Sequence, residues 1–300
     1  MEEKAAFFAI GDPGRAALEL PDGPPTTRIG PADVELSMAS LPGMLIRGAS
    51  VRGLQHRSRG TVRQDAFALG HRAGAGEAVA VVCDGVGSLG RSDEAAVLVS
   101  RRLAEFGAGG LPWPEAVARA NEELGKFAGE AGEAASPANS HADGMATTAV
   151  AVTVRREAGG WAGEAAWVGD STLWHLSSGG QWTLLTGSSL DGAEADYHST
   201  GVKPLPSVDG ACIWCGFRIS GGALFVMTDG VANPLRWSRD VQSMLAGWWL
   251  RPPDPFTFAA QVGFARKSHL DDRTVVGIWA DGGDQDAGRD SEPRAAVVPG

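Results

Sequence analysis

Short apolar runs separated by turn residues fill most of the chain, and this pattern predicts a protein built on sheets. Turn residues such as the SSGG of residues 177–180 stand between the runs, as is typical of strands joined by tight connections. The expected strands cover residues 44–51, 65–69, 79–83, 147–154, 161–168, 173–176, 182–185, 211–219, 223–227 and 274–280.

Longer segments repeat their apolar residues with the period of a helix. These expected helices cover residues 92–106, 113–131, 241–250 and 255–267. Ser92, followed by Asp93 and Glu94, suits a helix N-terminus because its hydroxyl can cap free N–H groups and the acidic residues favour the helix dipole. Strands, two helices, strands, two helices and a closing strand predict an α+β fold in which helices cover sheets.

The composition supports one globular domain with extensions. Hydrophobic residues make up 43% of the 300 and charged residues 21%, which is close to the average for proteins that bury a core. We expect a single domain over residues 43–280. A partly ordered N-terminal arm, rich in Pro and Gly, covers residues 1–42, and a flexible polar tail covers residues 281–300.

The charge balance excludes some partners. With 26 basic and 36 acidic residues the formal net charge is −10, so we expect no nucleic-acid partner, because such binding relies on clustered Lys and Arg. The N-terminus lacks the features of a signal peptide, and no apolar stretch is long enough to cross a bilayer, so we expect a cytoplasmic protein without a membrane partner. Acidic residues can instead surround a divalent cation.

Four aspartates lie at the edges of apolar runs, where side chains can leave the core. Asp65 opens one run, Asp84 and Asp229 each end one, and Asp271 precedes the last. Asp84 and Asp229 are each followed by Gly, which would let the backbone turn sharply. Carboxylates are ligands for Mg²⁺ or Mn²⁺, but Asp-Gly is also a common turn. The spacing alone leaves both interpretations open.

Six blocks of sequence resemble, in order, those of the metal-dependent protein phosphatase family (PPM, or protein phosphatase type 2C), in its bacterial-type variant. The resemblance runs from about residue 48 to residue 280. It implies a central β-sandwich of two mostly antiparallel sheets flanked by helix pairs, in four layers α-β-β-α. The blocks are HRSRGTVRQDAF (56–67), VVCDGVGS (81–88), DGMATTAVAVTV (143–154), WVGDSTLWHL (167–176), FVMTDGV (225–231) and DDRTVV (271–276).

The resemblance also implies a metal centre. Asp84 would bridge two Mn²⁺ or Mg²⁺ ions, with Asp65 and the Gly85 carbonyl on one ion and Asp229 and Asp271 on the other. These four aspartates are therefore also the expected catalytic residues. A metal-bridging water would attack the phosphorus.

The resemblance also indicates positions for a third metal ion, for phosphate binding and for a flap. Asp143 lies where bacterial members hold a third, weaker ion, and Asn233 stands where some members have an Asp. No Arg is in clear register with the phosphate-binding Arg of the family. His56 and Arg59 are the expected phosphate contacts, or else surface charges. Residues 186–207 would form a flap that shapes substrate entry.

The resulting hypothesis is a serine/threonine protein phosphatase that hydrolyses phosphomonoesters. Its partners would be a phosphorylated protein substrate and an opposing Ser/Thr kinase system, and we expect a monomer. Two alternatives remain at this point. The first is a catalytically weak pseudophosphatase that binds phosphoproteins as a regulatory module, and the second is a phosphomonoesterase for small molecules.

Overall fold

Two antiparallel sheets lie face to face in the computed structural model, which describes residues 8–24, 30–133, 144–186 and 203–281. The six-stranded sheet has the order β1-β2-β11-β10-β7-β8 and the five-stranded sheet the order β3-β4-β5-β6-β9. The strands are β1 (Val34–Leu41), β2 (Met44–Val51), β3 (Ala66–Arg72), β4 (Glu77–Cys83), β5 (Ala149–Glu157), β6 (Gly160–Val168), β7 (Thr172–Leu176), β8 (Trp182–Leu184), β9 (Ile213–Ser220), β10 (Ala223–Met227) and β11 (Arg273–Ala280).

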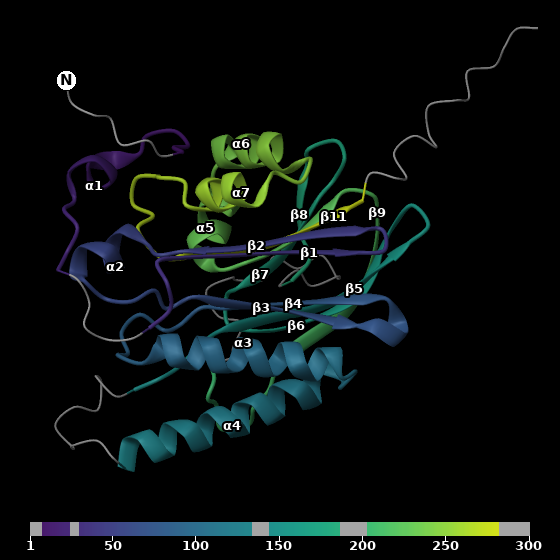
Figure 1. Ribbon diagram of the computed structural model, residues 1–300, viewed down its shortest axis with the longest axis horizontal. Helices are drawn as coiled ribbons and strands as arrows, with labels where there is room; N and C mark the ends of the chain where they lie inside the picture. The colour runs from purple at the N-terminus through teal and green to yellow at the C-terminus, as the bar shows by residue number, and fades with distance from the viewer. Residues whose placement is uncertain (1–7, 25–29, 134–143, 187–202, 282–300) are drawn as a thin grey trace, which may run out of the picture.

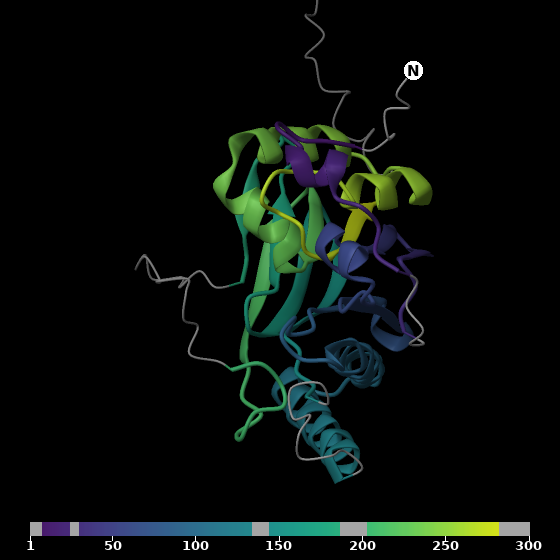
Figure 2. The ribbon, with the colours of Figure 1, turned by 90° about the vertical axis from the view of Figure 1, so that its left-hand side faces the viewer.

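Helices cover the outer face of each sheet (Figure 1). Helices α3 and α4 pack on the five-stranded sheet, whereas α5, α6 and α7 pack on the six-stranded sheet; α1 and α2 lie at one end of the sandwich (Figures 1 and 2). The predicted four-layer α+β sandwich is confirmed. The helices are α1 (Gly14–Glu19), α2 (Leu54–Arg59), α3 (Ser92–Ala108), α4 (Trp113–Glu133), α5 (Asp229–Trp237), α6 (Arg239–Trp249) and α7 (Pro255–Val262).

The central strands read as continuous apolar runs because they are covered on both faces. Every residue of β7 and β10 is buried, and so is every residue of β4 after Glu77. The opposite sheet covers one face and helices cover the other. Burial of each large aliphatic side chain in these layers contributes about 1.5–3 kcal/mol. The edge strand β9 instead alternates between exposed and half-buried positions.

Residues 34–41, which lie within the expected arm, form the edge strand β1. The strand was not predicted because polar residues interrupt its apolar ones, in keeping with its partial exposure. All eight residues nevertheless pair with β2 across the turn at Gly43. The chain before them is also tied to the domain. Ile10 is buried and its N–H donates to the Ala265 carbonyl, while the Ala265 N–H donates to Phe8.

The helices differ from expectation at the C-terminal end of the domain. The expected helix 255–267 ends at Val262, because Gly263 follows. Asp229 does not simply end a strand; it is the first residue of α5, a helix that the sequence pattern did not predict. An acidic residue at this position is favoured by the helix dipole. Among the described residues, no helix combines the length and the apolar character that crossing a bilayer requires.

Candidate active site

The four predicted aspartates meet at the end of the sandwich nearest α2. Asp65 precedes β3, Asp84 follows β4, and Asp229 and Asp271 lie next to β10 and β11. The charge of Asp271 contributes to raising the pKa of each of the other three, as expected for carboxylates that lie close together. The structure therefore brings together residues that are up to 206 positions apart in the sequence (271 − 65).

Burial and mutual repulsion dominate the electrostatics of this site. Desolvation is the largest cause that raises the pKa of Asp65 and Asp84 well above the ordinary value, and it is also the largest of the causes that together raise the pKa of Asp229 to about 6. The next cause in each case is another carboxylate, which is Asp272 for Asp65, Asp65 for Asp84 and Asp170 for Asp229. A group of carboxylates held together against repulsion gains free energy when a cation neutralises it.

The donor set fits a hard divalent cation. The four side chains are aspartates and offer carboxylate oxygens, and the backbone carbonyl that follows Asp84 is a further oxygen donor. Oxygen-only sites suit Mg²⁺ and Mn²⁺ rather than softer metals.

Hydroxyl groups fix the side chain of Asp65. Thr228 and Thr274 each donate an Oγ1–H to Oδ2 of Asp65, both at 2.8 Å. Ser50 lies 2.6 Å from the Thr274 hydroxyl. Because the Thr274 proton is used on Asp65, Ser50 donates in that bond. The backbone N–H of Thr274 in turn donates to the Thr228 hydroxyl at 3.1 Å, so this carboxylate is held by a closed network between β2, β10 and β11.

The main chain of Asp84 is anchored to the start of β5. Its carbonyl accepts from the Thr147 hydroxyl and from the Thr148 N–H, both at 2.8 Å. Gly85 forms a bridge with Thr147. These contacts hold the strand end from which the Asp84 side chain leaves the core.

The glycines after Asp84 and Asp229 serve close packing, not a sharp turn as the sequence suggested. Neither adopts the left-handed conformation. A Cβ on Gly85 would lie 2.8 Å from the Gln64 carbonyl oxygen, and one on Gly230 would lie 2.0 Å from that of Asp272. Each glycine thus lets one ligand-bearing segment touch the backbone of another, which a larger residue would prevent.

The expected phosphate contacts His56 and Arg59 both lie on α2, in different surroundings. His56 is only 7% exposed, and its Nδ1 lies 2.9 Å from Oδ1 of Asp272. Burial alone would lower the pKa of His56, but Asp272 and, less strongly, Asp271 raise it above the ordinary value. Arg59 is exposed and lies beside the Gln55 amide. The phosphate-binding role of both residues stays a prediction.

Asp170, Asn233 and Asp272 also contribute to the site, although none of them was predicted from the sequence as a metal ligand or a phosphate contact. Asp170 follows β6, and its charge contributes to raising the pKa of Asp84 and Asp229. Asn233 donates from Nδ2 to Oδ2 of Asp229 at 3.1 Å. The signal for Asp170 was its place at the end of an apolar strand, which it shares with Asp84. Nothing in the local sequence distinguishes Asp272 from a surface residue.

Two expected features fall outside the described residues. Asp143, the expected third-metal ligand, is one, and most of the expected flap, residues 187–202, is the other. After the flap, Leu205 is buried and pairs with Thr147.

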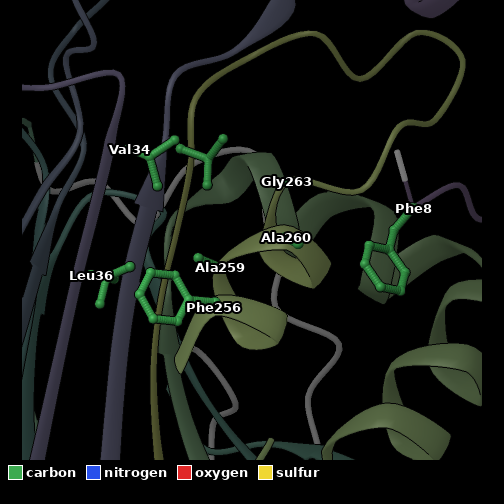
Figure 3. A pocket seen from close by; sticks show the side chains of 8 residues that line it. Phe8, Val34, Leu36, Phe256, Ala259, Ala260 and Gly263 are labelled. Atoms are coloured by element: carbon green, nitrogen blue, oxygen red, sulfur yellow. The ribbon is translucent and has the colours of Figure 1, made fainter. Parts of the chain in front are cut away.

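A large hollow in the surface is not part of this site. It has a volume of about 560 Å³ and lies between the edge strand β1, helix α7 and Phe8 (Figure 3). Its walls are apolar, with Phe256 and Val34 among them, and none of the carboxylates lines it. The hollow and the carboxylate cluster are therefore separate features of the surface.

Comparison with known proteins agrees with this architecture. Residues 52–261 match the sequence profile described as Protein phosphatase 2C. The chain therefore belongs to the protein phosphatase 2C family, and its class is that of the metal-dependent serine/threonine protein phosphatases. A search of curated proteins found no match.

Solved structures share the fold at low sequence identity. Serine/threonine phosphatase Stp1 from Staphylococcus aureus has a TM-score of 0.58 and 18% identity, covering 81% of this chain and 96% of that chain. The S. agalactiae serine/threonine phosphatase has a TM-score of 0.55 and 17% identity, with coverages of 83% and 100%. PppA from Pseudomonas aeruginosa, described as a regulatory component of T6SS, has a TM-score of 0.51 and 20% identity, with coverages of 80% and 99%.

Proposed function

We propose that the carboxylate cluster holds two Mn²⁺ or Mg²⁺ ions and that the chain uses them to hydrolyse phosphoserine and phosphothreonine in proteins. Asp84 would bridge the ions, Asp65 and the Gly85 carbonyl would bind one, and Asp229 and Asp271 the other. The observation that carries this proposal is the convergence of the four carboxylates, three of which (Asp65, Asp84 and Asp229) have pKa values raised by burial and by neighbouring carboxylates.

When bound, such ions would acidify a water for attack on phosphorus and neutralise charge on the phosphoryl oxygens. The chain's own residues prepare the site for this. Thr228 and Thr274 hold one oxygen of Asp65, and the Thr147 and Thr148 donors hold the backbone of Asp84. Preorganised ligands need no rearrangement at the moment of reaction, and this lowers the barrier.

Arg59 is the residue that we propose as the contact of the substrate phosphate. It is exposed, and it lies on α2 one helical turn from His56, whose ring contacts Asp272 beside the proposed ligand Asp271. A guanidinium can bind two phosphate oxygens at once. His56 is already engaged with Asp272, so its contribution to phosphate binding would be smaller.

The physiological setting that we propose is cytoplasmic signalling in which a Ser/Thr kinase opposes the phosphatase, with the monomer as the active form. A third, weaker metal would involve Asp143. The hydrogen bond from Asn233 to Asp229 puts an amide where a further carboxylate would strengthen that ion, which supports a two-metal enzyme under ordinary conditions.

Hydrolysis of para-nitrophenyl phosphate tests the proposal. The assay compares Mn²⁺, Mg²⁺, Ca²⁺ and EDTA, for wild type and for Asp84→Ala. We expect turnover with Mn²⁺ or Mg²⁺ that both EDTA and the variant abolish. A folded protein that binds Mn²⁺ but hydrolyses neither this ester nor a phosphopeptide would contradict the proposal and favour a phosphoprotein-binding role. Faster hydrolysis of free phosphoserine than of a phosphothreonine peptide would indicate small-molecule substrates.

A further inference from the structure

Asp272, the neighbour of the proposed ligand Asp271, is a buried carboxylate with partners on both of its oxygens. It is 2% exposed. Oδ1 accepts the N–H of Gly53 at 2.6 Å and lies 2.9 Å from Nδ1 of His56. Oδ2 accepts the N–H of Gln64 at 2.6 Å. Short bonds from N–H groups to an ionised carboxylate are stronger than bonds between neutral groups.

These bonds fasten both ends of one segment to a single side chain. Gly53 directly precedes α2, and Gln64 directly precedes Asp65, so the segment 53–64 is held where it begins and where it ends. The segment also touches the chain just before Asp272, because the Gln55 N–H donates to the Leu270 carbonyl at 3.0 Å.

Glycine at position 53 is required by the same packing. A Cβ there would lie 2.3 Å from the carbonyl carbon of Asp271. The backbone around Asp271 and the backbone that leads to Asp65 are therefore in direct contact, with Asp272 between them. Both proposed ligands lie next to this bridge in the sequence. Asp271 directly precedes Asp272, and Asp65 directly follows Gln64, whose N–H Asp272 accepts.

We propose that Asp272 is a positioning residue that sets Asp65 and Asp271 relative to each other before metal binds. The inference rests on the proposed function, because it concerns the ligands of the same metal centre. Asp272 fixes the backbones of the two segments, whereas Thr228 and Thr274 fix the side chain of Asp65.

A carboxylate is needed for this role, and an amide cannot replace it. Both oxygens accept from backbone N–H groups, so Asn at position 272 would turn its NH₂ toward either Gly53 N–H or Gln64 N–H. Two donors would then face each other in a buried place, at the cost of an unsatisfied group. Asp272→Asn thus keeps the size of the side chain and removes the bridge.

The alternative role for Asp272 is that of a metal ligand. One ligand atom each from His56, Asp271 and Asp272 lie within 4.8 Å of one another, as in a small cation site. Positioning and ligation predict different stoichiometries, because the loss of a positioning residue weakens every site, whereas the loss of a ligand removes one ion.

The experiment is isothermal titration of metal-free protein with Mn²⁺, for wild type and Asp272→Asn. We expect the same number of ions and an affinity lower by about 10–100-fold, the usual effect of losing a residue that orients metal ligands. At saturating Mn²⁺, we expect kcat to fall and the KM for a phosphopeptide to stay unchanged. Asp240→Asn, at an exposed position of α6, is the matched control and should titrate like wild type.

An unchanged Mn²⁺ affinity would overturn the proposal, and a stoichiometry lower by one would replace it with a ligand role for Asp272. The titration decides this even if the protein hydrolyses nothing, so failure of the proposed function is seen separately. If Asp272→Asn does not fold, hydrogen exchange of the wild-type amides decides instead. Protection of Gly53 and Gln64 in EDTA supports the proposal, whereas protection that arises only with Mn²⁺ overturns it.

Discussion

Asn233 donates a hydrogen bond to Asp229 one turn earlier in α5, with Nδ2 3.1 Å from Oδ2. One oxygen of a proposed metal ligand is therefore occupied by an amide of its own helix. A carboxylate at position 233 would present a second negative charge to the same space.

Asn233→Asp should make the metal-free protein less stable and its response to metal larger. Like charges one helical turn apart cost about 0.2–0.5 kcal/mol, which corresponds to a fall of about 0.5–2 °C in Tm for a domain of this size. Thermal unfolding in EDTA and in Mn²⁺ measures both effects. Asn233→Ala, which removes the bond without adding charge, is the control, and equal Mn²⁺-induced shifts in the two variants would contradict the prediction.

Thr228→Val should destabilise the protein, because Asp65 loses one of its two hydroxyl donors. The substitution keeps the shape of the side chain, so the expected loss of about 1–3 kcal/mol comes from the Asp65 carboxylate and the Thr274 N–H, each of which loses the Thr228 hydroxyl as a partner. Urea unfolding in EDTA measures the loss. Thr228→Ser keeps a hydroxyl and should retain most of the stability. If the Val and Ser variants unfold at the same urea concentration, the bond contributes nothing.

Asp84→Asn should stabilise the metal-free protein while it abolishes turnover. The variant removes a carboxylate that burial and the neighbouring carboxylates make unfavourable in its charged form, and single stabilising substitutions commonly contribute about 0.5–2 kcal/mol. Urea unfolding in EDTA shows whether the free energy of unfolding of the variant is higher or lower than that of wild type. In Mn²⁺ the order should reverse, because wild type gains binding free energy that the variant lacks. Lower stability of Asp84→Asn in EDTA would show that metal-free repulsion is not a significant cost.

His175 should make stability fall at acidic pH. Burial lowers the pKa of His175, and the bond from Nε2 to the Gly221 carbonyl opposes this only in part. The unfolded chain takes up this proton below a pH of about 6.5, but the folded chain does so only at lower pH, so stability is lost as the pH falls from about 7 toward 5. His175→Gln should show a weaker pH dependence in denaturant unfolding. Parallel curves for the two proteins would rule out this contribution.

Ile10→Ala should cost about 2–4 kcal/mol, the usual range for truncating a buried aliphatic side chain. Ile10 is 1% exposed and belongs to the core between the six-stranded sheet and its helices. Urea unfolding measures the effect, with Val208→Ala at a fully exposed position as the control. A loss no larger than that of the control would mean that the N-terminal segment packs only loosely.

The sequence predicted best the elements whose environment is uniform. The expected strand 223–227 coincides with β10, since burial on both faces requires an unbroken apolar run. The sequence predicted least well the elements that form only by pairing with a neighbouring strand. Residues 34–41 read as a loop because none of them is buried and four of the eight are exposed, and only the pairing with β2 makes them a strand.

The same distinction applies to the site. The four aspartates could be predicted because each lies next to a recognisable apolar run. The bridge from Asp272 to Gly53 and Gln64 could not, because it joins residues more than 200 positions apart. For the same reason His56 looked like a free cation in the sequence, whereas its ring is buried against Asp272.

The pairing of the first and last parts of the domain has a consequence for synthesis on the ribosome. Residues 8–10 bond to Ala265, and β2 pairs with β11. A growing chain presents Asp65 and Asp84 long before Asp229 and Asp271 have left the exit tunnel. The six-stranded sheet cannot close until β11 has emerged, and contacts so distant in sequence form late. Both the six-stranded sheet and the proposed metal site are therefore incomplete until β11, which ends at Ala280, has left the exit tunnel.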